Sequence, residues 1–277
     1  MALAPAVAPL TGEALDSALR AVADFVDLKS PYLAGHSSGV ADLAVAAAGC
    51  LRLPAPVAVD LGHAALVHDL GRVGVSAAVW GRPRPLTAGE WEVVRLHPYH
   101  TDRVLGRSPA LGRLAAIASL HHERLDGSGY FRGAPAGQQP AAARVLAAAD
   151  AYHAMREPRP HRPAMGAGQA AAELGRGVRA GRLDRDAVDA VLEAAGHRVG
   201  RRKAHPGGLT AREAEVLRLL ARGLSTRQIA AALTIAPKTA GNHIQAIYDK
   251  AGVSSRAAAT VFAMRHGFMD PLVEKMG

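Results

Sequence analysis

The feature that most constrains this chain is a set of seven imidazole and carboxylate donors spread over about half of its length. Such ligands suit Mn, Fe or Zn, and a set of this size can hold two ions that share a carboxylate. A single histidine on an apolar face is usually just a packed side chain. An adjacent His-Asp pair and an adjacent His-His-Glu triplet are hard to explain in that way. The sequence therefore predicts a metal site built from His36, His68, Asp69, His97, His121, His122 and Asp150.

The composition favours an all-α fold. Hydrophobic residues make up 49% of the 277 residues but aromatic residues only 4%, so the core must be built from Ala, Leu and Val. Side chains of this kind favour closely packed helices over sheets. The sequence shows no strand-like alternation of useful length and no internal repeat. The length allows two domains.

Several helix boundaries can be predicted from local signals. A Ser or Thr followed three residues later by Glu or Gln forms a capping box, which marks a helix start. Such boxes occur at Thr87/Glu90, Thr210/Glu213 and Ser225/Gln228. Further helices are predicted at 168–180 and 184–195. A helix at 237–250 would begin with a proline, whose missing N–H costs nothing in the first turn. Its buried stripe would consist of Ile244, Ile247 and Tyr248.

Positive charge is concentrated in the last third of the chain. Residues 197–277 contain 13 Lys/Arg and 5 Asp/Glu, whereas residues 1–196 are nearly balanced with 20 and 19. A basic surface can simply be solvated. It can also bind a polyanion, because neutralised phosphates release counterions and drive association. The basic run at 198–203, followed by Pro206-Gly207-Gly208, is typical of a linker before a new domain.

We expect a cytoplasmic protein that does not interact with membranes. The single cysteine, Cys50, excludes an internal disulfide framework and fits a reducing compartment. It lies in an apolar stretch and is predicted to be a small core residue. The N-terminal residues lack a basic region and contain prolines, so they do not resemble a signal peptide. No window offers about 18 uninterrupted apolar residues, which a membrane span would need.

Five motifs around the donors resemble a known family. They are GHSSGVADLA (35–44), LVHDLGRVGV (66–75), HPYHTDRVL (97–105), HHERLDGSGY (121–130) and RVLAAADAYHAM (144–155). In this order and with these gaps, they resemble the HD-GYP branch of the HD phosphohydrolases over residues 15–195. The resemblance implies an HD-type helical bundle that acts as a two-metal phosphodiesterase on cyclic di-GMP.

The resemblance also assigns ligands to two divalent metal ions (Mn, Fe or Zn). His36, His68, Asp69 and Asp150 would hold one ion, and Asp69 would bridge to a second. The second ion would be held by His97, His121 and His122. Some family members carry a Glu one helical turn before the first histidine, which supports a third metal. Tyr32 stands at that position here, so two metals are expected.

Substrate residues follow from the same resemblance. Asp69 and Arg72 would be catalytic, and Arg72 replaces the family's usual Lys, but its guanidinium can still clamp a phosphate. Arg159 and Arg162 match positions that touch substrate phosphates. The segment Asp126, Gly127, Ser128, Gly129 and Tyr130 matches the substrate loop. Phe131 replaces the proline of the family motif, which predicts a looser loop. His153 stands at a usually acidic position, His161 would line the pocket, and His63 would be structural.

The stretch 209–259 resembles the LuxR/GerE-type DNA-binding domain, a small four-helix helix-turn-helix domain. A small helical bundle that binds protein is the alternative. The resemblance implies that helix 237–250 enters the major groove of double-stranded DNA and that helix 254–265 forms a homodimer on it. The loss of a capping Ser or Thr at Ala236 costs roughly 0.5–2 kcal/mol.

Roles in DNA binding are divided between bases and phosphates. Asn242 and Gln245 match positions that face bases, and their amides can pair with adenine edges. Arg227, Lys238, Thr239 and Lys250 are better placed for phosphates. Gly241 lies on the exposed face of the helix and adds flexibility, at a cost of about 1 kcal/mol relative to Ala.

Three functions remain open from the sequence. The first is a cyclic di-GMP phosphodiesterase fused to a DNA-binding domain, and the second is a regulator that binds a nucleotide or metal with little or no turnover. The third is a phosphohydrolase for another nucleotide. The predicted division is a tail (1–12), a phosphohydrolase domain (13–196), a linker (197–208), a DNA-binding domain (209–270) and a second tail (271–277).

Overall fold

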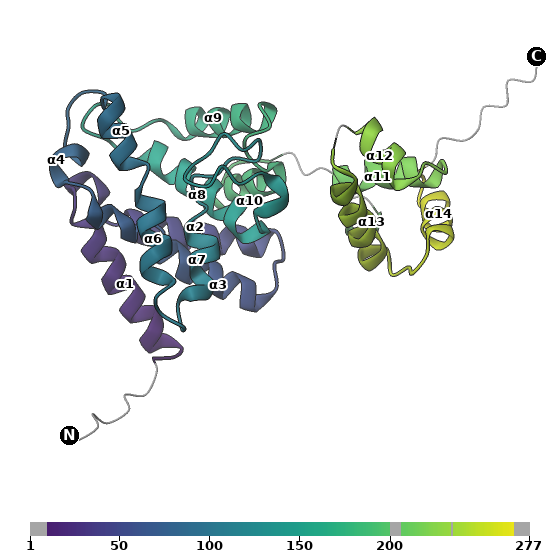
Figure 1. Ribbon diagram of the computed structural model, residues 1–277, viewed down its shortest axis with the longest axis horizontal. Helices are drawn as coiled ribbons and strands as arrows, with labels where there is room; N and C mark the ends of the chain where they lie inside the picture. The colour runs from purple at the N-terminus through teal and green to yellow at the C-terminus, as the bar shows by residue number, and fades with distance from the viewer. Residues whose placement is uncertain (1–9, 200–205, 234, 269–277) are drawn as a thin grey trace, which may run out of the picture. The chain divides into compact units, whose positions relative to one another are not determined.

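The computed structural model describes residues 10–199, 206–233 and 235–268, which form helices and no β-strand (Figure 1). The predicted all-α class is therefore confirmed. The chain divides into two compact units after Val199, within the segment predicted as a linker. The predictions for the two tails and the linker fall wholly or partly on residues 1–9, 200–205 and 269–277, which lie outside the described residues.

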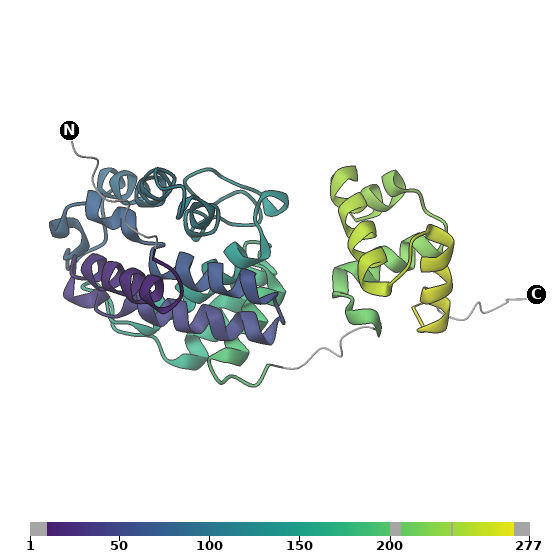
Figure 2. The ribbon, with the colours of Figure 1, turned by 90° about the horizontal axis from the view of Figure 1, so that it is seen from below.

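The first unit is a bundle of α-helices. In chain order they are α1 (Glu13–Asp27), α2 (His36–Cys50), α3 (Ala55–Leu66), α4 (Ala77–Trp80), α5 (Ala88–Val94), α6 (His97–Leu105), α7 (Gly112–Ala118), α8 (Ala141–Arg156), α9 (Ala167–Arg179) and α10 (Arg185–Ala194). The purple α1 lies beside α2 and α3 in both views (Figures 1 and 2). The capping box at Thr87 and Glu90 is present and begins α5.

Alanine side chains build the centre of this bundle. Helix α2 packs against α3, α8 and α10. Its buried face carries Ala41, Ala44, Ala47 and Ala48, and α8 buries Ala142, Ala143, Ala147, Ala148 and Ala149. Small side chains at a helix contact allow the two axes to approach closely. The close approach brings the start of α2 next to the middle of α8, which is where two of the predicted metal ligands lie.

The second unit contains α11 (Ala211–Ala221), α12 (Thr226–Ala232), α13 (Pro237–Ala251) and α14 (Arg256–Arg265). Capping boxes begin α11 and α12 as predicted. Pro237 opens α13, and Ala236 before it provides no side-chain cap. Ile247 is buried, while Ile244 and Tyr248 are partly buried against the same core. Gly252 ends α13 in the left-handed conformation, with a φ of 65° that suits glycine.

An ion pair ties α11 to α13. The carboxylate of Glu213 is buried and accepts hydrogen bonds from the Thr210 backbone N–H at 2.7 Å and from Lys250 Nζ at 2.8 Å. Burial by itself would raise the pKa of Glu213, but Lys250 and the hydrogen bonds from Thr210 together outweigh it and lower the pKa below its ordinary value. Lys250 therefore has a structural partner within the fold.

The prediction that Cys50 belongs to the core is wrong, because its side chain is exposed. Ala47 and Ala48 carry the buried face of α2 at this end. Cys50 lies two residues beyond Ala48, about 200° further around the helix, and therefore faces away from the core. None of the helices that the structure describes has both the length and the apolar character that spanning a bilayer requires.

Candidate metal centre and nucleic-acid interface

The seven predicted ligands converge in the first unit, mostly from the ends of helices. His36 begins α2, His97 begins α6, and Asp150 lies within α8. The pairs His68-Asp69 and His121-His122 lie in turns that follow α3 and α7. Six of the seven side chains are buried, and His122 is 18% exposed. Six of the seven ligands therefore lie at the start of a helix or in the turn that follows one.

Asp69 lies between two groups of histidines. Its Oδ2 atom is 3.0 Å from His68 Nε2 and 3.5 Å from His36 Nε2. Its Oδ1 atom is 3.3 Å from His97 Nε2 and 3.4 Å from His121 Nε2. Each carboxylate oxygen thus faces a different pair of imidazoles, which is the arrangement that a bridging carboxylate needs.

Asp150 and His122 complete the two groups. Asp150 Oδ1 lies 3.3 Å from His36 Nε2, on the Oδ2 side of Asp69. His122 offers a ring nitrogen close to those of His97 and His121, and these three atoms lie within 4.8 Å of one another. The ligand atoms of His36, His68 and Asp150 lie equally close together.

The backbone fixes how the imidazoles are oriented. The Nδ1 atoms of His68, His97 and His121 each donate a hydrogen bond to the carbonyl three residues earlier, at 2.7, 2.6 and 2.7 Å. A ring that donates through Nδ1 presents the lone pair of Nε2, and here Nε2 faces Asp69. The backbone carbonyls therefore aim the Nε2 atoms of these three rings at Asp69.

Unsatisfied buried atoms show that the site fits cations. His36 Nε2, His68 Nε2 and both carboxylate oxygens of Asp69 are buried without a hydrogen-bond partner. Buried polar atoms are normally paired, so a group of unpaired acceptors in one place requires an explanation. Divalent cations bound by imidazole and carboxylate would satisfy all of them.

The protonation states also suit cation binding. Burial by itself would raise the pKa of Asp69, but Arg72 and His68 outweigh it and hold the pKa well below its usual range. Asp150 shows the same balance, with His36 and His68 lowering its pKa against burial. Burial lowers the pKa of His121 to about 4. Near neutral pH, the carboxylates are therefore charged and His121 is neutral. Burial would lower the pKa of His68, but Asp69 and Asp150 outweigh it and raise the pKa to about 10. A cation bound there would displace the proton of His68.

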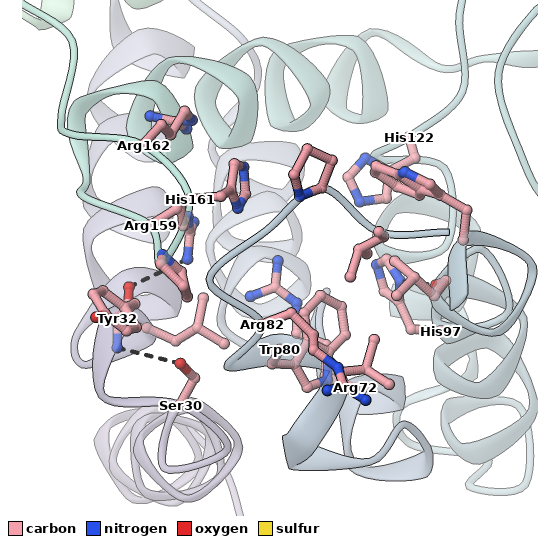
Figure 3. A pocket seen from close by; sticks show the side chains of 17 residues that line it. Ser30, Tyr32, Arg72, Trp80, Arg82, His97, His122, Arg159, His161 and Arg162 are labelled. Carbon is pink, nitrogen blue, oxygen red and sulfur yellow. Dashed lines mark hydrogen bonds between the residues drawn. The ribbon is translucent and has the colours of Figure 1, made fainter. Parts of the chain in front are cut away.

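A cavity of about 350 Å³ opens beside these ligands, and Figure 3 shows the side chains that line it. His97 and His122 form one end of its lining. The predicted substrate residues Arg72, Arg159 and Arg162 line it as well, together with His161, as expected. Arg72 Nη2 lies 2.7 Å from Asp69 Oδ2, while its Nε and Nη1 atoms are buried without a hydrogen-bond partner. These two donors remain available to an anionic ligand.

The predicted substrate loop is not placed as a unit in this cavity. Asp126 is exposed and accepts hydrogen bonds from the N–H and hydroxyl of Ser128, which form a local turn. Gly127 has a φ of 79° and adopts the left-handed conformation of that turn. Asp126, Gly127 and Gly129 are absent from the residues that line the described cavity. The ring of Tyr130, however, lies 4.7 Å from the ring of His122.

A buried carboxylate that the sequence did not single out anchors this loop. Glu123 is 1% exposed and accepts hydrogen bonds from the backbone N–H groups of Arg132 at 2.7 Å and Ala134 at 2.8 Å. A Cβ on Gly129 would lie 2.4 Å from the Glu123 Cα, so only glycine fits there. Glu123 was seen only as the third residue of the His-His-Glu triplet, and the triplet gave no sign of this role.

In the second unit, the predicted DNA-contacting residues lie on α12 and α13. Arg227, Lys238, Asn242 and Gln245 are exposed, and Thr239 and Gly241 are partly exposed. Gln245 donates a hydrogen bond to Asp249 at 3.0 Å. Lys250 is held by Glu213, so its charge is partly neutralised within the fold.

Comparison with known proteins agrees with both units. Residues 20–187 match the family model described as HD domain, and residues 208–263 match the one described as bacterial regulatory proteins, luxR family. The chain belongs to the HD-domain family. Its second unit is a luxR-family domain, and both resemblances predicted from the sequence are confirmed.

The relatives match one unit or the other. The 3'3'-cGAMP-specific phosphodiesterase 3 of Vibrio cholerae is 38% identical over 167 residues, 60% of this chain and 36% of the relative. A cyclic di-GMP phosphodiesterase of Pseudomonas aeruginosa is 36% identical over 140 residues, 50% of this chain and 34% of the relative. The probable transcriptional regulatory protein NarL of Mycobacterium tuberculosis is 52% identical over 62 residues, 22% of this chain and 29% of the relative. The matches therefore span about a third of each relative.

Glu157 is another residue of this HD domain that sequence reasoning missed. His36 Nδ1 donates to its carboxylate at 3.0 Å, and Arg159 Nη2 donates to it at 2.8 Å. His153 Nδ1 lies 2.9 Å from it. Burial would raise the pKa of Glu157, but His153 and His36 outweigh it and lower the pKa to about 2. Glu157 directly follows the last residue of α8, Arg156, and has an extended backbone, so a helical pattern in the sequence could not place it.

Glu157 therefore connects His36, a predicted metal ligand, to Arg159 in the cavity lining. A carboxylate on the far nitrogen of a ligating histidine fixes the ring and makes the other nitrogen more basic. His153 fits beside it only because residue 39 is glycine, since a Cβ there would lie 2.1 Å from His153 Nε2. His153, which stands at the usually acidic position, contacts Glu157, and Glu157 in turn orients the ring of His36.

We predict that Glu157→Gln weakens the retention of divalent metal by roughly ten- to a hundred-fold, the usual effect of removing such a partner. Competition of the metal-loaded protein against a chelator measures this directly. Glu173→Gln is the matched control, because Glu173 pairs with Arg176 on the exposed surface of α9. Equal retention in the two variants would contradict the role of Glu157.

Proposed function

We propose that the first unit is a metal-dependent phosphodiesterase that hydrolyses a cyclic dinucleotide. The observation that carries this proposal is the placement of Asp69, whose two oxygens face two separate groups of histidines. Beside it opens a cavity lined by arginines, which suits an anionic ligand. The two phosphodiesterase relatives are named for 3'3'-cGAMP and cyclic di-GMP, which supports a cyclic dinucleotide as the substrate class.

The residues can be given roles in this reaction. Bound at the two groups, a pair of divalent cations would lower the pKa of a shared water and neutralise charge on the phosphodiester. Asp69 would contribute one carboxylate oxygen to each group and so fix the distance between the two cations. Arg72 would orient the phosphate through its two unpaired donors, and Arg159 would hold the rest of the anion along the cavity. Arg162 would contribute less, because its Nη2 atom already donates to the Ala154 carbonyl at 2.7 Å.

One observation favours a second candidate, a regulator that binds the nucleotide with little or no turnover. Arg72 Nη2 lies 2.7 Å from the Oδ2 atom of Asp69. A guanidinium this close competes with a cation for the same oxygen. Turnover separates the two candidates, because both would bind metal and ligand.

We predict that the full chain, purified without oxygen and supplied with Mn²⁺ or Fe²⁺, converts a cyclic dinucleotide into linear dinucleotide or mononucleotide. Chromatography of the products measures the conversion, with cyclic di-GMP and 3'3'-cGAMP as parallel substrates. Asp69→Ala should reduce the product to the uncatalysed level, because both groups lose their shared oxygen ligand.

The matched control is Asp60→Ala, which removes a surface carboxylate that pairs with Arg113. It should retain wild-type turnover. Protein that binds metal and cyclic dinucleotide but forms no product would contradict the phosphodiesterase and establish the regulator. Turnover of a different nucleotide alone would show that the substrate class is wrong.

We further propose that the second unit binds double-stranded DNA through α13. Its charge and the exposed faces of Lys238, Asn242 and Gln245 support this proposal, as does the luxR-family match. Asn242 and Gln245 would read base edges, while Arg227, Lys238 and Thr239 would contact phosphates. Lys250 would contribute less than the sequence suggested, because Glu213 already holds it.

Helix α14 offers a surface for a homodimer on DNA. Its Val261 is 47% exposed and its Met264 is 60% exposed. Two large apolar side chains on one short helix are costly to leave in water, and a second copy would cover them. We also propose that nucleotide turnover in the first unit changes the affinity of the second unit for DNA.

We predict that Lys238→Ala lowers the affinity of the chain for a random-sequence duplex and reduces the slope of log K against log salt by about one. Gln245→Ala should leave that slope unchanged and broaden the sequences that the protein selects from a random pool. Lys29→Ala, in the first unit, is the control for lysine removal. A slope that is identical in Lys238→Ala and wild type would contradict the phosphate contact.

A further inference from the structure

Both tryptophans of the chain line the cavity beside the metal centre. The chain contains only two, Trp80 and Trp91, and only 4% of its residues are aromatic. Trp80 is the last residue of α4 and Trp91 lies in α5, so two separate helices each contribute one ring to the cavity. Figure 3 shows Trp80 between the arginines and His97. Both tryptophans of a chain with few aromatic residues therefore lie in the lining of one cavity.

The cavity has an apolar wall that a phosphate does not explain. One continuous stretch of chain supplies it, with Val79, Trp80, Pro85, Leu86, Trp91 and Val94. The arginines and histidines of the lining suit an anion, whereas apolar and aromatic surface suits a flat, weakly hydrated group. In a cyclic dinucleotide, the parts with that chemistry are the bases.

The two tryptophans differ in what else they contact. The guanidinium of Arg72 lies 5.1 Å above the Trp80 ring, and the ring of His97 meets it edge-on at 6.1 Å. The indole N–H of Trp80 is buried without a hydrogen-bond partner. Trp91 is 44% exposed, so much of its ring is open to a ligand. Trp80 is thus held in place by the metal centre, while Trp91 is free to stack.

We propose that this wall is a nucleobase site, in which Trp80 and Trp91 contact a purine base while the arginines hold its phosphate. The inference rests on the proposed function and names the part of the substrate that the wall recognises. A volume of about 350 Å³ is at the lower end of the range for small-molecule pockets, which suits one nucleotide of the pair.

The test compares a ligand that carries a base with one that lacks it. GMP and ribose 5-phosphate share a phosphate and a sugar, and only GMP has a purine. Binding of each to the metal-loaded full chain is measured by calorimetry. Tryptophan fluorescence is followed in parallel, because both of the chain's tryptophans lie in the cavity. GMP should change the fluorescence, and ribose 5-phosphate should change it far less.

Variants then separate base stacking from an indirect effect through Arg72 or His97. Trp91→Leu should weaken GMP binding by about ten-fold, a typical effect of losing one stacked base contact, and should leave ribose 5-phosphate binding unchanged. Trp80→Leu should show the same selectivity, and Trp80→Phe should recover most of the lost affinity. Metal content equal to that of wild type in each variant shows that the site is folded.

The possible results distinguish this inference from the proposed function. A wild-type protein that hydrolyses cyclic dinucleotides while both Leu variants bind GMP normally would overturn the nucleobase site alone. Equal losses for GMP and ribose 5-phosphate would also overturn it and would make the tryptophans supports of Arg72. A wild-type protein that neither binds nor hydrolyses any cyclic dinucleotide would overturn both proposals.

Discussion

The buried carboxylate of Asp69 is the group on which the first unit depends. It is 1% exposed and ionised, and neither oxygen accepts a hydrogen bond. A buried charge is costly unless opposite charge or polar partners compensate it. Compensation here comes from Arg72 and from imidazole nitrogens on both sides, and bound cations would complete it. The other predicted ligands lie where their side chains can compensate the buried charge of Asp69.

Two features of the fold meet that requirement. Alanine-rich faces let α2 and α8 approach closely, so that His36 and Asp150 reach the same point. Backbone carbonyls at the ends of α3 and α7 and before α6 then fix the histidine rings, so that each presents its Nε2 atom to Asp69. The same residues that pack the bundle therefore also define the chemistry of its centre.

The sequence predicted the parts of this site that follow from neighbouring residues along the chain and from helix-start motifs. The pairs His68-Asp69 and His121-His122 stand out in the sequence, and the capping boxes gave the helix starts. Glu157 could not be found in this way, because its role depends on where α8 ends and on the ring orientation of His36. Spacing cannot show which side chains enclose a cavity either, so the tryptophans were missed.

Other differences have the same physical origin. Asp126 was expected to bind substrate from its place in a motif, but its carboxylate is exposed and forms a turn with Ser128. Lys250 is predicted to contact DNA, and the structure adds that Glu213 of the neighbouring α11 holds its ammonium group. In each case the motif located the residue correctly along the chain, while the tertiary structure decided which partner the side chain has.

The central claim is that Asp69 bridges two cations. Crystals of the full chain grown with Mn²⁺ would test it most directly, through the anomalous scattering of the metal. Two peaks are expected, one beside His36 and one beside His97, with a different oxygen of Asp69 next to each. A single peak, or two peaks of which neither touches Asp69, would contradict it.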